Sequence, residues 1–203
     1  MKKEEQKIDV SIFNWGPCVL RMKIVDDLKK LLLTEGKKNT KDFTTRLAGI
    51  IEKETGYDEE AKAKVVPYLS NYLGVYDQMY EKFINKKYEK RPHYVMSALW
   101  INYQKAGEFN PPHDHDGKLS FVIYLQIPDE LKKEQDKHIG TASKPGSLTF
   151  LVGQGAENFI NYKSFVPQVG DFFIFPKDLY HFVEPFKSKG ERISLAFNLK
   201  ETG

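Results

Sequence analysis

The sequence predicts an α+β protein with a mainly β core, a sandwich or barrel of short strands that follows a helical N-terminal part. The pattern of residue types changes near residue 90. Apolar residues have helical spacing before it, and runs of β-forming residues come after it. The chain has 203 residues, of which 40% are hydrophobic, enough to bury one core. We therefore expect a single domain over residues 1–203, in which residues 1–90 support a core formed by residues 91–203.

The N-terminal part is expected to begin with a strand over residues 19–25 and to continue as helices. Acidic residues in a first turn complement the helix dipole, so Asp26 favours a helix over residues 26–34, which Gly36 would end. The spacing of the next apolar residues predicts a second helix over residues 41–53.

A third and longer helix is expected over residues 59–86. Its apolar residues recur at steps of three and four, which places them in one stripe on a helix surface. Such a stripe usually packs on the rest of the protein, and pairing with a partner helix is the alternative. Pro67 lies inside the segment and predicts a kink or a late start. The stripe consists of Val65, Leu69, Tyr72, Tyr76, Met79 and Phe83.

Several runs rich in β-branched and aromatic residues predict the strands of the core. They cover residues 94–103, 120–127, 147–152, 172–175 and 193–199. The segment 129–145 is polar and rich in lysine. We expect it to be a mobile connection between two strands, and its length makes it a candidate lid.

The overall composition excludes several classes of protein. A net charge of +3 gives no reason to expect a nucleic-acid or membrane binder. No run of apolar residues is long enough to span a bilayer, and no apolar run follows the charged first residues as in a signal peptide. The one cysteine, Cys18, cannot form an intramolecular disulfide. The sequence therefore predicts a soluble, intracellular protein, which we expect to be cytoplasmic.

Three of the five histidines stand where they could hold a metal ion. His113 and His115 are two residues apart, so in an extended segment both side chains point to one face. His181 follows a later strand and could supply a third imidazole, a ligand that suits iron, zinc, copper or nickel. His93 and His138 have no partner at such a spacing, and we expect both to be ordinary surface or hydrogen-bonded residues.

An arginine near the C-terminus is a candidate anion-binding residue. Alternation along the last strand places Arg192, Ser194 and Ala196 on one face. Arginine can hold a carboxylate through two parallel hydrogen bonds, and a buried arginine without a partner is costly. A surface ion pair with Glu184 or Glu191 is the alternative.

Taken together, these motifs resemble the iron(II)- and 2-oxoglutarate-dependent oxygenases, especially their prolyl-hydroxylase-like branch. The resemblance covers residues 91–203 and rests on the order and spacing of its parts. It implies a double-stranded β-helix, or jelly roll, with N-terminal supporting helices. The matching parts are Tyr103, the HDH of residues 113–115, Tyr124-Leu125, the GSLTF run, Gly170-Asp171, His181 and Arg192-x-Ser194.

The resemblance also implies roles for individual residues. His113 and His181 match the two histidine ligands of the iron, and Arg192 matches the residue that binds the distal carboxylate of 2-oxoglutarate. The implied activity couples decarboxylation of 2-oxoglutarate, with O2, to oxidation of a substrate, usually by hydroxylation. The substrate is unidentified, and a peptidyl residue is the first candidate. Three further residues match positions that hydrogen-bond the same cosubstrate: Ser194, Tyr103 and Tyr124.

The sequence departs from the family's pattern at one ligand. The family's carboxylate ligand stands two residues after the first histidine, and here that residue is His115. Either His115 completes a site of three histidines, or Asp116 reaches the metal through a turn at Gly117, or the site is inactive. We favour His115, because residues two apart share a face in an extended chain.

Two other classes of protein are alternative hypotheses for the β core. A cupin would match the later motif around His181, but it needs a glutamate where Leu119 and Ser120 stand. Such a protein would be another metal-binding enzyme or a sugar-binding protein. A non-enzymatic β-sandwich that binds a ligand would account for the strands, but not for three histidines together with Arg192.

Overall fold

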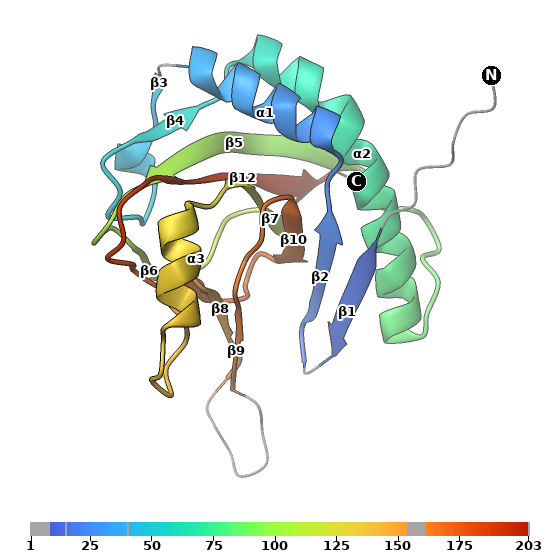
Figure 1. Cartoon of the computed structure of the whole chain (residues 1–203). Helices are drawn as coiled ribbons and strands as arrows, with labels where there is room; N and C mark the ends of the chain where they lie inside the picture. Colours follow the sequence, from blue (N-terminus) through green and yellow to red (C-terminus); the bar gives the residue numbers. More distant parts are fainter. Residues whose placement is uncertain (1–8, 15, 40, 154–160, 203) are drawn as a thin grey trace, which may run out of the picture.

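Two antiparallel sheets pack against each other, and two long helices cover the outer face of the larger sheet (Figure 1). The computed structural model describes residues 9–14, 16–39, 41–153 and 161–202. The larger sheet has eight strands in the order β1-β2-β10-β7-β12-β5-β4-β3, and the smaller has four in the order β6-β11-β8-β9. The predicted α+β fold with a mainly β core is confirmed, as two sheets enclosing a common interior.

The larger sheet is built from β1 (Val10–Asn14), β2 (Cys18–Lys23), β3 (Lys41–Asp42), β4 (Glu54–Gly56), β5 (Tyr94–Gln104), β7 (Leu119–Gln126), β10 (Asp171–Pro176) and β12 (Arg192–Glu201). The smaller sheet is built from β6 (Asn110–His113), β8 (Leu148–Leu151), β9 (Tyr162–Phe165) and β11 (His181–Val183). The helices are α1 (Asp26–Lys38), a 3-10 turn (Thr44–Arg46), α2 (Glu59–Ile84) and α3 (Asp129–Asp136).

Strand β10 shows why the central strands are apolar on both faces. Phe172 and Ile174 belong to the core between the larger sheet and the helices α1 and α2, whereas Phe173 and Phe175 belong to the core between the two sheets. Successive side chains of a strand point to opposite faces, so a strand covered on both sides has no polar face. The interior between the sheets is thus available to side chains from both of them.

The predicted strand over residues 19–25 and two of the three predicted N-terminal helices are confirmed, as β2, α1 and α2. The side chain of Asp58 accepts a hydrogen bond from the Ala61 amide and so caps the start of α2. Pro67 lies on the exposed side of α2 without ending it. Gly36, expected to end α1, instead lies inside it: a Cβ there would come within 2.6 Å of the Tyr57 hydroxyl. This glycine allows close packing on the sheet.

The predicted helix over residues 41–53 is wrong. The segment forms β3, a 3-10 turn and a loop, and β4 follows it as a neighbour of β5 at the side of the larger sheet. Phe43 stacks on Trp100 of β5 with ring centroids 5.9 Å apart, and it lies over Gly56, where any Cβ would collide with its ring. The local spacing of apolar residues favours a helix here, but pairing with β5 and packing on it stabilise the extended conformation instead.

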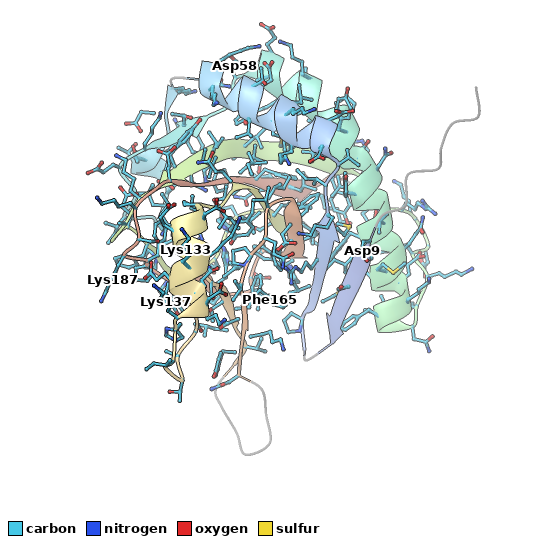
Figure 2. All side chains as sticks on the ribbon, viewed as in Figure 1. Asp9, Asp58, Lys133, Lys137, Phe165 and Lys187 are labelled. Carbon is cyan, nitrogen blue, oxygen red and sulfur yellow. The ribbon has the colours of Figure 1, made fainter. Side chains whose placement is uncertain are left out.

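Residues 129–145 connect two strands, β7 and β8, as expected, but the first half of the segment is the helix α3 rather than a loop. Leu131 is buried in the core between the sheets. Glu134 accepts hydrogen bonds from the backbone amides of Lys187 and Ser188, and Gln135 donates to the carbonyl of Pro145. Lys132 and Lys133 of α3 are both exposed, and Lys133 is labelled in Figure 2. The polar composition of this segment is thus that of a solvent-facing helix surface.

The later strands expected from their apolar runs are confirmed as β5, β7, β8, β10 and β12. The strands that no pattern in the sequence predicts are β1, β3, β4, β6, β9 and β11, most of which are short. Four strands of the larger sheet, β1 to β4, come from the part of the chain that we expected to be mostly helical. In the described part of the chain, no helix combines the length and the apolar character that crossing a membrane requires.

Candidate functional site

The three histidines singled out in the sequence lie together at one end of the interior between the sheets. His113 ends β6 and His181 begins β11, and the two residues face each other in the register of these strands. His115 lies two residues beyond the end of β6. One ring nitrogen from each residue lies within 4.8 Å of the others, and the Nε2 atoms of His115 and His181 are 3.2 Å apart. The imidazoles therefore converge on one point.

Backbone carbonyls orient two of these rings. Nδ1 of His113 lies 2.7 Å from the carbonyl oxygen of Pro111, and Nδ1 of His181 lies 2.9 Å from that of Leu179. A carbonyl only accepts, so each Nδ1–H donates and each Nε2 presents a lone pair to the cluster. This arrangement is typical of imidazoles that bind a metal ion.

Burial keeps the three imidazoles neutral. It lowers the pKa of His113, and it lowers the pKa of His115 to about 3 together with the nearby His113. For His181 burial and the charges of the other two rings hold the pKa well below its ordinary value. Neutral imidazoles are the form that binds metal ions, so no proton needs to leave before a cation enters.

The aspartates beside these histidines point away from the cluster. Asp114 and Asp116 are both exposed, and neither belongs to the group of ligand atoms that converge among the described residues. Gly117 has a positive φ of 109°, and a Cβ there would collide with the carbonyl oxygen of Leu199. The predicted turn thus exists, but it carries the chain toward the end of β12 rather than toward the histidines.

A narrow cavity extends from the histidines into the interior. It is lined from the smaller sheet by Asn110, His113, Leu148, His181 and Val183, and from the larger sheet by Trp100, Asn102, Phe121, Val122, Tyr124, Phe175, Arg192, Ser194 and Ala196, with His115 and Ile51 beside them. The predicted face of Arg192, Ser194 and Ala196 is confirmed, because all three line this cavity.

Arg192 is a buried cation without an acidic partner. Its exposed fraction is 2%, its Nη1 donates to the carbonyl of Gly146, and its Nε has no hydrogen-bond partner. None of the ion pairs among the described residues includes it, so the alternative of a surface pair with Glu184 or Glu191 is wrong. A buried guanidinium in this state can receive a carboxylate.

Further polar atoms near Arg192 also lack partners. The guanidinium lies 5.3 Å from the ring centroid of Tyr124, whose buried hydroxyl has no hydrogen-bond partner. Burial raises the pKa of Tyr124 to about 12, so the hydroxyl keeps its proton and can donate it. Asn102 donates from Nδ2 to the Ser194 hydroxyl at 3.3 Å, and its Oδ1 is unpaired. The hydroxyls of Tyr124 and Ser194 are thus available to donate to a small acid held by Arg192.

Tyr103 is the one predicted site residue that the structure does not bring to the cavity. Along β5, Trp100 and Asn102 point into the interior, and Tyr103 points to the opposite face. There it belongs to the core beneath the helices, with the ammonium of Lys53 at 4.3 Å from its ring centroid. Asn102, which the sequence analysis missed, occupies the inward position. Its register with Ser194 could have identified it, because residues directly opposite share a face.

Comparison with protein-family models identifies the family described as 2OG-Fe(II) oxygenase, which matches residues 98–198, about half of the chain. Comparison with curated proteins gives no match. The matched residues include all of β7, most of β5 and of β12, and all three clustered histidines.

Solved structures of similar fold agree with this family. A prolyl-4-hydroxylase from Pseudomonas putida is 16% identical, with a TM-score of 0.53 over 91% of this chain and 93% of that one. The viral collagen prolyl hydroxylase of Paramecium bursaria chlorella virus-1, in its 2-oxoglutarate complex, is 13% identical, with a TM-score of 0.55 over 89% and 94%.

A prolyl hydroxylase from Trichoplax adhaerens, solved with a hypoxia inducible factor peptide, is 12% identical and has a TM-score of 0.57 over 93% of this chain and 84% of that one. At these sequence identities, similarity to the solved structures shows the fold, which is a double-stranded β-helix. Membership in the oxygenase family is shown by the match to the family model. This chain belongs to the 2OG-Fe(II) oxygenases and is an enzyme that uses iron(II) and 2-oxoglutarate.

Proposed function

We propose that His113, His115 and His181 hold the iron and that Arg192 binds 2-oxoglutarate, in an enzyme that hydroxylates a peptidyl residue. The observation that carries this assignment is one cavity with three convergent neutral imidazoles at one end and, farther in, a buried guanidinium without an acidic partner. Imidazole nitrogen suits iron, and a guanidinium suits a carboxylate. The residues present therefore fit both groups.

The chain's own residues would position the reactants. The carbonyls of Pro111 and Leu179 fix the rings of His113 and His181, and three protein ligands leave the remaining coordination positions of an iron ion open. When bound, iron(II) and 2-oxoglutarate supply the oxidising chemistry: one oxygen atom of O2 enters the substrate while 2-oxoglutarate becomes succinate and CO2.

The far end of the cavity would select 2-oxoglutarate among small acids. Arg192 would hold its distal carboxylate through charge-assisted hydrogen bonds, and the Tyr124 hydroxyl would donate a further one. The Ser194 hydroxyl, which accepts from Asn102 Nδ2, would donate its own proton to the same carboxylate. Tyr103 has no place in this set, because it lies on the other face of β5.

His115 rather than Asp116 would be the third ligand. His115 Nε2 already lies beside His181 Nε2, whereas Asp116 is exposed and beyond the cluster. We further propose that residues 1–203 form one domain, because β1 to β4 are strands of the same sheet as β5, β7 and β12.

Two proteins of similar fold support a peptidyl substrate, a collagen prolyl hydroxylase and a prolyl hydroxylase solved with a peptide fragment. A small molecule is the competing substrate class, since another similar structure, HygX from Streptomyces hygroscopicus, has hygromycin B bound. Succinate release with a peptide library and with a library of small natural products would separate the two.

Anaerobic addition of Fe(II) and 2-oxoglutarate tests the site itself. The expected result is a weak visible absorption band that needs both additions, that disappears in His113→Ala and His181→Ala, and that requires far more 2-oxoglutarate in Arg192→Ala. His138→Ala, which removes a histidine outside the cluster, is the matched control and should keep the band. If wild-type protein binds neither addition, the assignment is wrong.

A further inference from the structure

A buried carboxylate lies beside the proposed cosubstrate site without any partner. Glu54 of β4 has an exposed fraction of 1%, and neither of its carboxylate oxygens has a hydrogen-bond partner. None of the ion pairs formed within the described ranges includes this residue. A buried acid in this state is costly and calls for an explanation. One explanation is a ligand that donates hydrogen bonds to its carboxylate oxygens.

The strand register places Glu54 on the face of the sheet that lines the cavity. Glu54 is paired directly with Asn102 of β5, and Asn102 is paired with Ser194 of β12. Directly opposite residues of antiparallel strands share a face, so these three form a row across three strands. Two strand spacings put Glu54 roughly 10 Å from Ser194. Ile51, three residues before Glu54, already lines the cavity.

Hydrogen-bond acceptors without donors gather on this side of the cavity. Besides the two oxygens of Glu54, the amide oxygens of Asn102 and Asn110 are buried and unpaired. Burial, and then the carboxylates of Glu108 and Asp42, raise the pKa of Glu54 to about 7. The charged groups that act on Glu54 are thus negative as well. The complement of such a surface is a group with several N–H donors and a positive charge.

The segment around Gly49 lies against Glu54. A Cβ on Gly49 would lie 3.2 Å from Glu54 Oε1, and Gly49 is only half-buried. The backbone amide of Ile50 donates to the carbonyl of Phe109 and holds this segment over the side of the sheet. Glu54 is therefore close beneath the surface, where a substrate side chain could reach it.

We propose that Glu54 is a specificity residue that binds a cationic group of the substrate, an ammonium or guanidinium as in a lysyl or arginyl side chain. This rests on the proposed function of the same cavity. Arg192 and Glu54 carry opposite charges and lie on one face of the sheet, with β5 between their strands. The positive end would take 2-oxoglutarate and the negative end would take the cation, so each ligand is directed to its own end.

Titration with a blocked lysine tests the proposal. The probe is N-acetyl-lysine methylamide, added by calorimetry to the full chain with Fe(II) and 2-oxoglutarate under anaerobic conditions. Wild-type protein should bind it saturably and should bind N-acetyl-norleucine methylamide, its neutral analogue, at least tenfold more weakly. Glu54→Gln should weaken lysine binding at least tenfold. Glu52→Gln removes an exposed carboxylate two residues away and should leave binding unchanged.

Two results would overturn the proposal: no saturable binding of the lysine probe to wild-type protein, or equal binding to wild-type protein and folded Glu54→Gln. The visible band with Fe(II) and 2-oxoglutarate, measured in each variant, shows that Glu54→Gln is folded and still binds the cosubstrate. If that band is absent from wild-type protein, the proposed function fails. The lysine titration on the metal-free chain then still decides the role of Glu54.

Discussion

Replacing Glu54 with glutamine should change how the stability of the protein depends on pH. The substitution keeps the shape of the side chain and removes its ionisation. Glu54 is buried and unpaired, so the folded protein holds its proton more tightly than the unfolded chain does. As pH rises, the unfolded chain loses this proton first, and the folded state becomes less stable relative to it.

The magnitude follows from the two pKa values. Burial raises the pKa of Glu54 from 4.5 to about 7, and a difference of one pKa unit corresponds to about 1.4 kcal/mol. The cost of ionising Glu54 is absent below pH 4.5, grows between pH 4.5 and 7, and reaches at most ~3 kcal/mol above pH 7. Solvent that reaches the side chain past Gly49 would reduce this figure.

Chemical unfolding at pH 5 and pH 8 measures the effect. The free energy of unfolding of Glu54→Gln minus that of wild-type protein should increase by about 2 to 3 kcal/mol from pH 5 to pH 8. The same difference for Glu52→Gln should stay flat, since Glu52 is exposed. If the Glu54→Gln difference is equal at both pH values, the carboxylate has a partner or access to water, and the inference about its role loses its basis.

Three further perturbations test the site and the fold. Arg192→Ala should raise the Kd for 2-oxoglutarate about 100-fold, since charge-assisted hydrogen bonds worth roughly 3 kcal/mol are lost, as measured by anaerobic titration. His115→Ala should lower Fe(II) affinity at least about tenfold in competition with a chelator, whereas Asp116→Ala should not change it; the reverse order would make the aspartate the ligand. Gly117→Ala should destabilise by about 2 to 3 kcal/mol more than Gly107→Ala in chemical unfolding, because both glycines have positive φ but only the first has no room for a Cβ; equal losses would contradict this packing.

The parts of the fold predicted correctly are those with a strong local pattern. The stripe from Val65 to Phe83 predicts α2 because it spans several turns, and the apolar runs around Phe121 and Phe173 predict strands covered on both faces. Short strands such as β4 and β11 contain three residues each, too few for any period to show. Their existence depends on neighbours far along the chain.

Glycines mark another limit of local reasoning. Gly36 is expected from the sequence to end a helix, and Gly56 follows the segment predicted as the second helix. In the structure Gly36 allows α1 to approach Tyr57, and Gly56 makes room for the ring of Phe43. The same residue type serves a helix end or a close contact, and only the tertiary neighbour distinguishes the two.

The candidate site was predictable where it depended on spacing within one strand. Alternation placed Arg192 and Ser194 on one face, and the two-residue spacing placed His113 and His115 together. The resemblance matched Tyr103 by its position in the chain, but the face of β5 that enters the cavity is set by its register with β12. Pairing between strands is a property of the assembled sheet, so no pattern within β5 could decide it.

Two buried charged side chains on the cavity-facing side of the larger sheet give the strongest indication that its polar residues serve ligands rather than the fold. Arg192 and Glu54 are both almost fully buried, and neither has an ion pair within the described residues. They do not neutralise each other either, since Arg192 Nε and both Glu54 oxygens are unpaired. Leaving either charge uncompensated costs several kcal/mol, and neutral residues of similar size would stabilise the sheet more. The chain keeps both on one face of the sheet, with the strand of Asn102 between them. An anion at Arg192 and a cation at Glu54 would each recover that cost, so the pair is best understood as two halves of a site for two oppositely charged reactants.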